Sequence, residues 1–141
     1  MEQAIVKEFS RIQADEALAE KLSIQPGEMV YRVLRLRRIE TGPYAIEKSY
    51  IPAFLVPELS PEQISREGLY GTLAMLGIHV DSARETFKAI NLNKEQSEWL
   101  NVRIDASAIR LTRTAYSGTL AAEYCISIVR GDFFSYSVEL N

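Results

Sequence analysis

The sequence predicts an α+β domain, a mostly antiparallel sheet with short helices packed on it. Three observations indicate this fold class. Apolar and polar residues alternate along several segments, which is typical of strands that cover a core with one face. Short amphipathic segments begin at Asp or Asn residues that suit helix N-caps. Finally, the same order of strand, capped helix and hairpin occurs twice, and no linker divides the chain.

The internal repeat emerges when the sequence is shifted by 78 residues. Several pairs of like residues then coincide: Phe9 with Phe87, Ile12 with Ile90, Arg32 with Arg110 and Arg35 with Arg113. Beyond the hairpin turn, an offset of 76 aligns Gly42 with Gly118 and Glu47 with Glu123. A solenoid needs about three repeats or more. We therefore interpret the two copies as pseudo-symmetric halves of one domain that share a sheet.

The first half predicts a strand over residues 5–13 and a helix that Asp15 caps and that reaches about Leu22. Pro26 and Gly27 predict a turn. Residues 30–39 and 44–51 then predict a hairpin around the turn at 41–43. Prolines at 52, 57 and 61 indicate an irregular connection to the second half.

A short helix is expected over residues 69–76, ended by Gly77. The second half predicts a strand over 78–90 and a helix over 94–100, with Asn93 as cap and Gln96 at the capping-box position. A hairpin follows, with strands over 107–117 and 119–129 around Gly118. After a turn at 130–132, a last strand is expected over 133–140, as part of the core or of an interface.

The composition excludes several functional classes. The 141 residues are 47% hydrophobic with a net charge of −3, so the chain is not expected to bind DNA or RNA by itself. No apolar run approaches the ~20 residues that span a bilayer, and the N-terminus is not a signal peptide, so we expect a cytoplasmic protein. With one cysteine, Cys125, and one histidine, His79, the sequence predicts no metal site, no cofactor and no catalytic residue.

Two arginines alternate with leucines along the first strand of the first hairpin. Arg35 and Arg37 share one face and lie about 6.6 Å apart along the strand, so both guanidinium groups can close on one anion. With a three-residue loop, Arg37 would lie opposite Glu47, and Arg35 opposite Ser49. The same residues also fit a cross-strand ion pair on a solvated face, which contributes roughly a few tenths of a kcal/mol. The spacing alone leaves both interpretations open.

These arginines belong to longer motifs that resemble a known family. The motifs are YRVLRLRRIETGPYAIEKSYIP, GLYGTLAMLGIHV and AEYCISIVRGDFFSYSVEL, in this order. They resemble the UTRA (UbiC transcription regulator-associated) effector-binding domain of GntR-family regulators of the HutC type, from about Val6 to Leu140. The resemblance implies a chorismate-lyase-like fold, one effector-binding domain over residues 1–141, and a metabolite sensor of a bacterial transcriptional regulator rather than an enzyme.

The resemblance also implies partners. The effector would be a small anionic metabolite, a sugar phosphate or a carboxylate. A homodimer is expected, without membrane contact. DNA would be bound only through an N-terminal winged helix-turn-helix domain that is absent from this chain.

Six site residues follow from the resemblance. Arg35 and Arg37 look like the clamp for a phosphate or carboxylate. Glu47 and Glu123 resemble the acidic residues that accept hydrogen bonds from the polar body of the effector. Arg84 resembles a further anion-binding arginine, although a charge on the strand surface is an equal alternative. The sixth residue, Gly68, lies at the start of the 69–76 helix, where backbone N–H groups can meet the effector.

Two residues depart from the family pattern. Gly68 replaces the serine that sugar-phosphate sensors commonly carry before Leu-Tyr, and Val129 replaces an aromatic residue that packs on the effector in many relatives. Both changes argue against an amino-sugar phosphate but are compatible with an anionic metabolite. Two other functions stay open: an enzyme of the chorismate-lyase type, and a dimerisation module whose pocket is vestigial.

Overall fold

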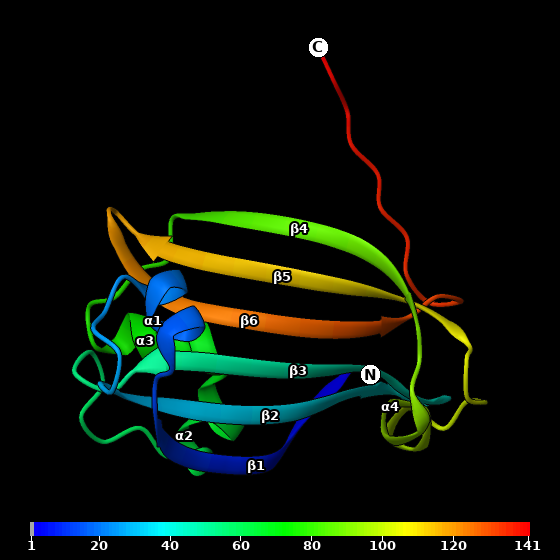
Figure 1. The fold of residues 1–141 in the computed structure, drawn as a ribbon, viewed down its shortest axis with the longest axis horizontal. Coiled ribbons are helices and arrows are strands. Elements are labelled where there is room, and N and C mark those ends of the chain that lie inside the picture. Colours follow the sequence, from blue (N-terminus) through cyan, green and yellow to red (C-terminus); the bar gives the residue numbers. More distant parts are fainter. Residues whose placement is uncertain (1) are drawn as a thin grey trace.

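A computed structural model describes residues 2–141, whose strands form one six-stranded antiparallel sheet in the order β1-β2-β3-β6-β5-β4 (Figure 1). The elements follow along the chain as β1 (Gln3–Gln13), α1 (Glu16–Leu22), β2 (Met29–Ile39), β3 (Gly42–Pro52), α2 (Pro61–Glu67), α3 (Leu69–Met75), β4 (Ser82–Asn91), α4 (Lys94–Leu100), β5 (Ser107–Ser117) and β6 (Leu120–Arg130). The predicted α+β class is confirmed. Strands β3 and β6 lie at the centre of the sheet, and β1 and β4 form its edges.

The helix caps agree with the sequence-based predictions. Asp15 accepts a hydrogen bond of 2.8 Å from the backbone N–H of Leu18, in the first turn of α1. Asn93 and Gln96 form the predicted capping box at the start of α4, because each side chain accepts from the other residue's backbone N–H. Both caps satisfy N–H groups that a helix leaves unpaired at its start.

The helices cover the two faces of the sheet in pairs. Alternation along β2 sends Val33 to the face under α2 and α3, and Leu34 to the face under α1 and α4. In Figure 1, α1 and α4 lie in front of the strands, whereas α2 and α3 lie behind them. The sheet is thus a shared layer between two apolar cores.

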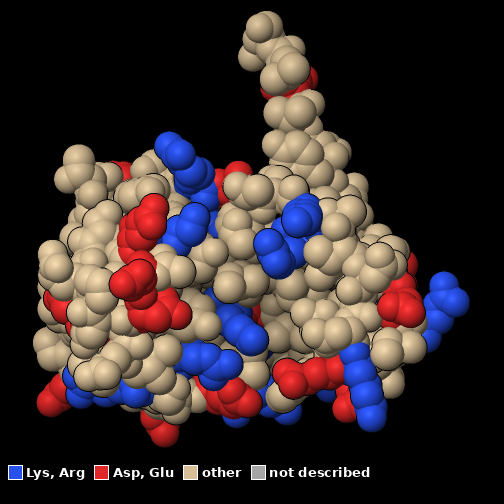
Figure 2. Space-filling model, in the orientation of Figure 1, with Lys and Arg blue, Asp and Glu red and all other residues tan. Residues whose placement is uncertain are grey.

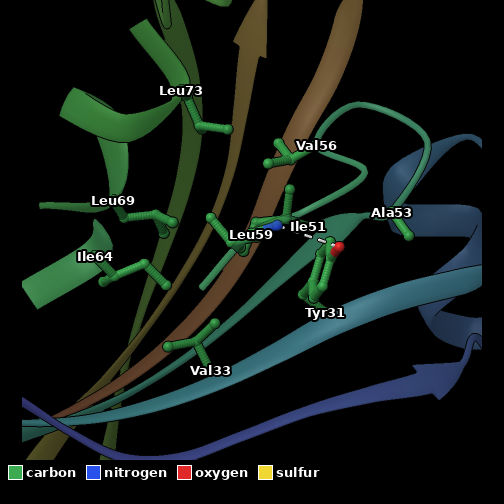
Figure 3. Close-up of a cluster of buried hydrophobic side chains, with 9 residues drawn as sticks. All are labelled: Tyr31, Val33, Ile51, Ala53, Val56, Leu59, Ile64, Leu69 and Leu73. Atoms are coloured by element: carbon green, nitrogen blue, oxygen red, sulfur yellow. Dashed lines mark hydrogen bonds between the residues drawn. The ribbon is translucent and has the colours of Figure 1, made fainter. Parts of the chain in front are cut away.

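The core on the α2–α3 face fixes the segment that precedes α2. Tyr31 of β2 donates a hydrogen bond of 2.6 Å to the carbonyl oxygen of Pro57 and accepts one of 3.3 Å from the N–H of Leu59. Figure 3 shows Tyr31 among the apolar side chains of this core, including Leu73 of α3. Each fully buried leucine contributes about 1.5–3 kcal/mol to the free energy of unfolding. This packing holds α3 against the sheet next to β3.

Two sequence-based predictions near α3 are wrong or incomplete. The connection after β3 contains α2, in which Ser60 caps the helix and Pro61 occupies the first turn, where its missing N–H costs nothing. The strand predicted from residue 78 begins only at Ser82, because the N–H of Ile78 bonds to the carbonyl oxygen of Leu73 and closes the end of α3. Both errors lie in short segments whose structure depends on packing against α3.

The last predicted strand is also wrong: residues 133–140 form no strand. The N–H groups of Phe133 and Phe134 both bond to the carbonyl oxygen of Arg130, which bends the chain off the end of β6. Figure 1 shows the final residues leading away from the body of the domain. Tyr136, Val138 and Leu140 are consequently 64%, 63% and 85% exposed.

The strand register corrects the alignment of the repeat. Ile39 pairs with Gly42 around the first turn, and Ser117 pairs with Leu120 around the second, so only two residues form each turn. A register shift interrupts each hairpin at matching positions, after Arg37 and after Ala115. The offset of 78 therefore holds through both hairpins, and the expected change to 76 is wrong.

Candidate functional site

A cavity of about 320 Å³ lies on the α2–α3 face, between the sheet and the start of α3. Five of the six residues implied by the resemblance line it: Arg35, Arg37, Glu47, Gly68 and Glu123. They come from β2, β3 and β6 and from the residue that precedes α3. The fold thus brings together residues that are up to 88 positions apart in the sequence (35 to 123).

Glu47 joins the two arginines of β2. Its carboxylate accepts hydrogen bonds from Arg35 Nη2 at 3.1 Å and from Arg37 Nη1 at 3.2 Å. The register places Glu47 opposite Arg35, not opposite Arg37 as a three-residue loop would. A two-residue turn followed by a bulge causes this difference. Arg37, which lies two residues further along β2 than Arg35, reaches the same carboxylate. The cross-strand ion pair that the sequence left open is therefore present.

Both arginines keep donors that this pairing does not use. A guanidinium group carries five N–H donors. The Nε atoms of Arg35 and Arg37 are buried, and neither has a hydrogen-bond partner among residues 2–141. Arg37 also pairs with Glu2, near the start of β1. A buried donor without a partner costs about 1–3 kcal/mol. A ligand that accepts hydrogen bonds from these two Nε–H groups would remove that cost.

Glu123 of β6 is the most deeply buried charged residue of the cavity, with 2% exposure. Its Oε1 accepts a hydrogen bond of 2.6 Å from the hydroxyl of Tyr70, in the first turn of α3. Burial raises the pKa of Glu123, although the hydrogen bond from Tyr70 and the charge of Arg35 act in the opposite direction. Burial likewise raises the pKa of Tyr70, so its hydroxyl stays protonated at neutral pH and remains a donor.

Arg113 of β5 is a third cavity arginine, which the sequence analysis did not assign to the site. Its Nε donates a hydrogen bond of 2.7 Å to Glu85 of β4. Burial disfavours the charged guanidinium, but the interactions with Tyr70 and Glu85 keep the pKa of Arg113 above its usual value. The repeat could have identified it, because the shift of 78 places Arg35 on Arg113. The Leu-Tyr motif of the family includes Tyr70, so this motif could have identified Tyr70 as a site residue.

Arg84 does not line the cavity. It lies on edge strand β4 opposite Thr114, whereas its neighbour Glu85 lies opposite Arg113. Because side chains alternate along a strand, Glu85 shares the face of Arg113 and Arg84 belongs to the other face. We therefore leave Arg84 out of the proposed site.

The chemistry of the cavity suits an anion with hydrogen-bonding groups. Three guanidinium groups face two carboxylates, and burial favours the protonated form of one of these, Glu123. The thiol of Cys125 also lines the cavity, and burial raises its pKa to about 12, so it is protonated at neutral pH. Within the described residues, no cluster of His, Cys, Asp and Glu side chains could hold a metal ion. No described helix is long and apolar enough to cross a membrane.

A polar, arginine-lined cavity between a sheet and the helices that cover it is typical of domains that bind small molecules. Residues 3–135 match the UTRA domain. The chain therefore belongs to the UTRA family, the effector domains of GntR-family transcriptional regulators, and it is not an enzyme.

The relatives are transcriptional regulators. The chain is 26% identical over 121 residues to the HTH-type transcriptional regulator GmuR of Bacillus subtilis, covering 84% of this chain and 51% of that protein. It is 26% identical over 132 residues to the HTH-type transcriptional repressor NagR of the same organism, covering 92% and 54%. The chain thus spans about half the length of these curated relatives.

The fold is also shared with solved structures. The ligand-binding domain of a GntR-family transcriptional regulator from Bordetella bronchiseptica superposes with a TM-score of 0.92, at 22% identity, over 100% of this chain and 90% of that one. This likeness shows a common fold for the two domains. It does not extend to the ligand.

Proposed function

We propose that this domain senses a small anionic metabolite, a sugar phosphate or a carboxylate, for a bacterial transcriptional regulator of the GntR/HutC type. One observation carries the proposal: the guanidinium groups of Arg35, Arg37 and Arg113 converge with Glu47 and Glu123 on one cavity. Its volume of about 320 Å³ is near the lower end for ligand pockets, which suits a metabolite.

Each residue has a role in this proposal. Arg35 and Arg37 bind the anionic group through the donors that Glu47 leaves unused. Glu123 and Tyr70 bind hydroxyl or amide groups of the effector's body. Gly68 leaves space at the wall, because a Cβ there would meet no atom within 4 Å. Its φ of 74° also favours glycine over the serine of sugar-phosphate sensors.

Effector binding would control DNA binding by linkage. An effector shifts the regulator only if it binds one arrangement better than another. A hundredfold change in operator affinity needs about 2.7 kcal/mol of coupling, and hydrogen bonds to charged groups contribute about 1.5–3 kcal/mol each. We assign DNA contact to a winged helix-turn-helix domain outside residues 1–141, in keeping with the HTH-type relatives that are about twice as long. Such a regulator acts in the cytoplasm.

We also propose that the domain forms a homodimer through its C-terminal segment and the edge strand β4. Phe87 of β4 contacts the rings of Phe134 and Tyr136, at centroid distances of 5.7 and 5.2 Å. Val138 and Leu140, which follow these rings in the chain, are exposed, and β4 is an edge strand of the sheet. An unpaired edge beside an exposed apolar segment is a surface on which a second copy can pack.

The hairpin register, which recurs at the same offset, supports an inference about the fold. We interpret the strand–helix–hairpin units as pseudo-symmetric halves, since Arg35 opposite Glu47 matches Arg113 opposite Cys125 at the same offset. The counterpart of Glu47 is then Cys125, and Glu123 is an anchor of the second half alone. On the basis of the family resemblance, we also propose that the domain has a chorismate-lyase-like fold.

A thermal-shift assay against sugar phosphates, dicarboxylates and acyl-phosphate mimics tests the proposed function. At a concentration of 100 times Kd, an effector stabilises the domain by about 2.7 kcal/mol. We expect at least one anion to raise Tm, and Arg35→Ala and Arg37→Ala to abolish the increase. Arg66→Ala is the matched control, because Arg66 is an exposed arginine of α2 that pairs with Glu67. If no anion raises Tm, the cavity is vestigial and the domain serves dimerisation only.

A further inference from the structure

A second cavity lies on the opposite face of the sheet, beside α4. It measures about 340 Å³. Its floor is apolar and comes from the three strands β2, β3 and β6, through Leu34, Ile46, Ile126 and Ile128. Strand alternation separates it from the first cavity, because Lys48 lines the second and its neighbour Glu47 lines the first.

Three basic side chains line this second cavity: Arg32, Lys48 and Arg110. Arg32 is paired with Glu8, at 2.9 Å between Nη1 and Oε1. Lys48 and Arg110 form no ion pair with any residue in the described range 2–141, and Glu95 is the one other acidic residue of the lining. Figure 2 shows Lys and Arg side chains gathered over the middle of this face. The cavity therefore has a surplus of positive charge.

Two unpaired cations can act on the same anion. Lys48 lies opposite Ile126 on β6, and Arg110 lies opposite Ile128, two residues further along that strand. Strand spacing and rise place their Cα atoms about 12 Å apart. Two long side chains that extend toward each other can close on one anionic group across this distance.

Aromatic side chains supply the remaining walls. Trp99 of α4 and Tyr50 of β3 line the cavity. An adjoining cavity of about 300 Å³ beside α1 shares Tyr50 and Ile126 with it, which extends the apolar surface toward Tyr124. An apolar floor, aromatic walls and a cationic rim are complementary to a ligand with a flat apolar body and one anionic group.

We propose that this cavity is a second binding site, specific for a small aromatic anion such as an aryl phosphate or an aryl carboxylate. The ring packs on the floor between Trp99 and Tyr50, and the anionic group binds Lys48 and Arg110. The site is separate from the arginine-lined cavity and does not depend on its function.

Trp99 makes the proposal directly testable, because it is the single tryptophan of the chain and lines only this one of the two cavities. Tryptophan emission is measured during titration of the 141-residue protein with phenyl phosphate. Phenol and inorganic phosphate, each lacking one half of the probe, are titrated in parallel. We expect a saturable change with phenyl phosphate and at least about tenfold weaker binding of either fragment.

Lys48→Gln and Arg110→Gln should each weaken phenyl phosphate binding by about tenfold. Arg66→Gln is the matched control and should bind as the unmodified protein does. Circular dichroism spectra verify that each variant is folded. An unsaturable response, equal affinity for phenol, or unchanged binding in both Lys48→Gln and Arg110→Gln would overturn the proposal. Loss of the response in Arg35→Ala would place the probe in the first cavity and also overturn it.

Discussion

Tyr70 and Glu123 form a hydrogen bond of 2.6 Å that joins the first turn of α3 to the central strand β6. The bond lies at the wall of the arginine-lined cavity and involves a carboxylate that is only 2% exposed. Without the hydroxyl of Tyr70, the carboxylate of Glu123 would lose this donor while staying buried. This contact therefore couples the shape of the cavity to the stability of the domain.

Tyr70→Phe tests this coupling. The variant removes the donor but keeps the ring, so we expect the free energy of unfolding to fall by about 1–3 kcal/mol. Urea unfolding measures the change. Tyr136→Phe is the control: it keeps the ring that we assign to the dimer and removes a hydroxyl of a 64% exposed residue, so it should change stability by less than about 0.5 kcal/mol. Equal effects of the two substitutions would show that the bond contributes nothing.

Glu123 predicts a dependence of stability on pH. Its pKa in the folded protein is raised above the ordinary 4.5, chiefly by burial. Between the two pKa values the folded state therefore binds more protons than the unfolded state, so stability falls as pH rises through this range. Its stabilising contribution is complete below pH 4.5 and is lost above the folded pKa.

Glu123→Gln should remove this dependence, because the amide does not titrate but still accepts from Tyr70. The free energy of unfolding is measured from pH 4.5 upward in both proteins. We expect the difference between Glu123→Gln and the unmodified protein to grow with pH in favour of the variant. A constant difference across the range would contradict the raised pKa.

Arg113 and Arg84 offer a matched test of the site's boundary. They lie on neighbouring strands, but only Arg113 lines the cavity. We expect Arg113→Gln to need about tenfold more effector than the unmodified protein for the same increase in Tm. Arg84→Gln should need the same concentration as the unmodified protein. The reverse result would restore the assignment that the resemblance implied and remove Arg113 from the clamp.

The C-terminal segment predicts the oligomeric state. Replacing Tyr136, Val138 and Leu140 by serine removes the exposed apolar side chains that we assign to the dimer. We expect a shift from dimer to monomer in light scattering, with no loss of circular dichroism signal. Thr substitutions of Ser135 and Ser137 in the same segment are the control. A triple variant that stays dimeric would place the interface elsewhere.

Local features of the fold could be predicted from the sequence, because they depend on neighbouring residues. The caps at Asp15 and Asn93 and the two hairpins required only side-chain chemistry and alternation. The hairpin register could not be predicted, since a two-residue turn followed by a bulge replaces the expected three-residue loop. The strand expected after Arg130 does not form, because a turn at that residue redirects an alternating apolar segment.

The candidate site likewise combines residues whose proximity is local with residues that only the whole fold brings together. Arg35, Arg37 and Glu47 share a hairpin, so their proximity follows from local pairing. Arg113 and Tyr70 join them through the strand order and through the packing of α3, which local pairing does not determine. For Arg113, the signal in the sequence was the repeat, which aligns it with Arg35. Arg84 was expected in the site but does not line the cavity, because the β4 side chain on the face of the cavity is Glu85.

The Nε–H groups of Arg35 and Arg37 allow the most direct test of anion binding, because both are buried and unpartnered within residues 2–141. Their NMR resonances, assigned with Arg35→Lys and Arg37→Lys, are followed while inorganic phosphate is added to the protein. We predict that both resonances shift together along one saturable curve, while the resonance of Arg66 does not move. Saturating phosphate that leaves both resonances in place would contradict an anion site between these arginines.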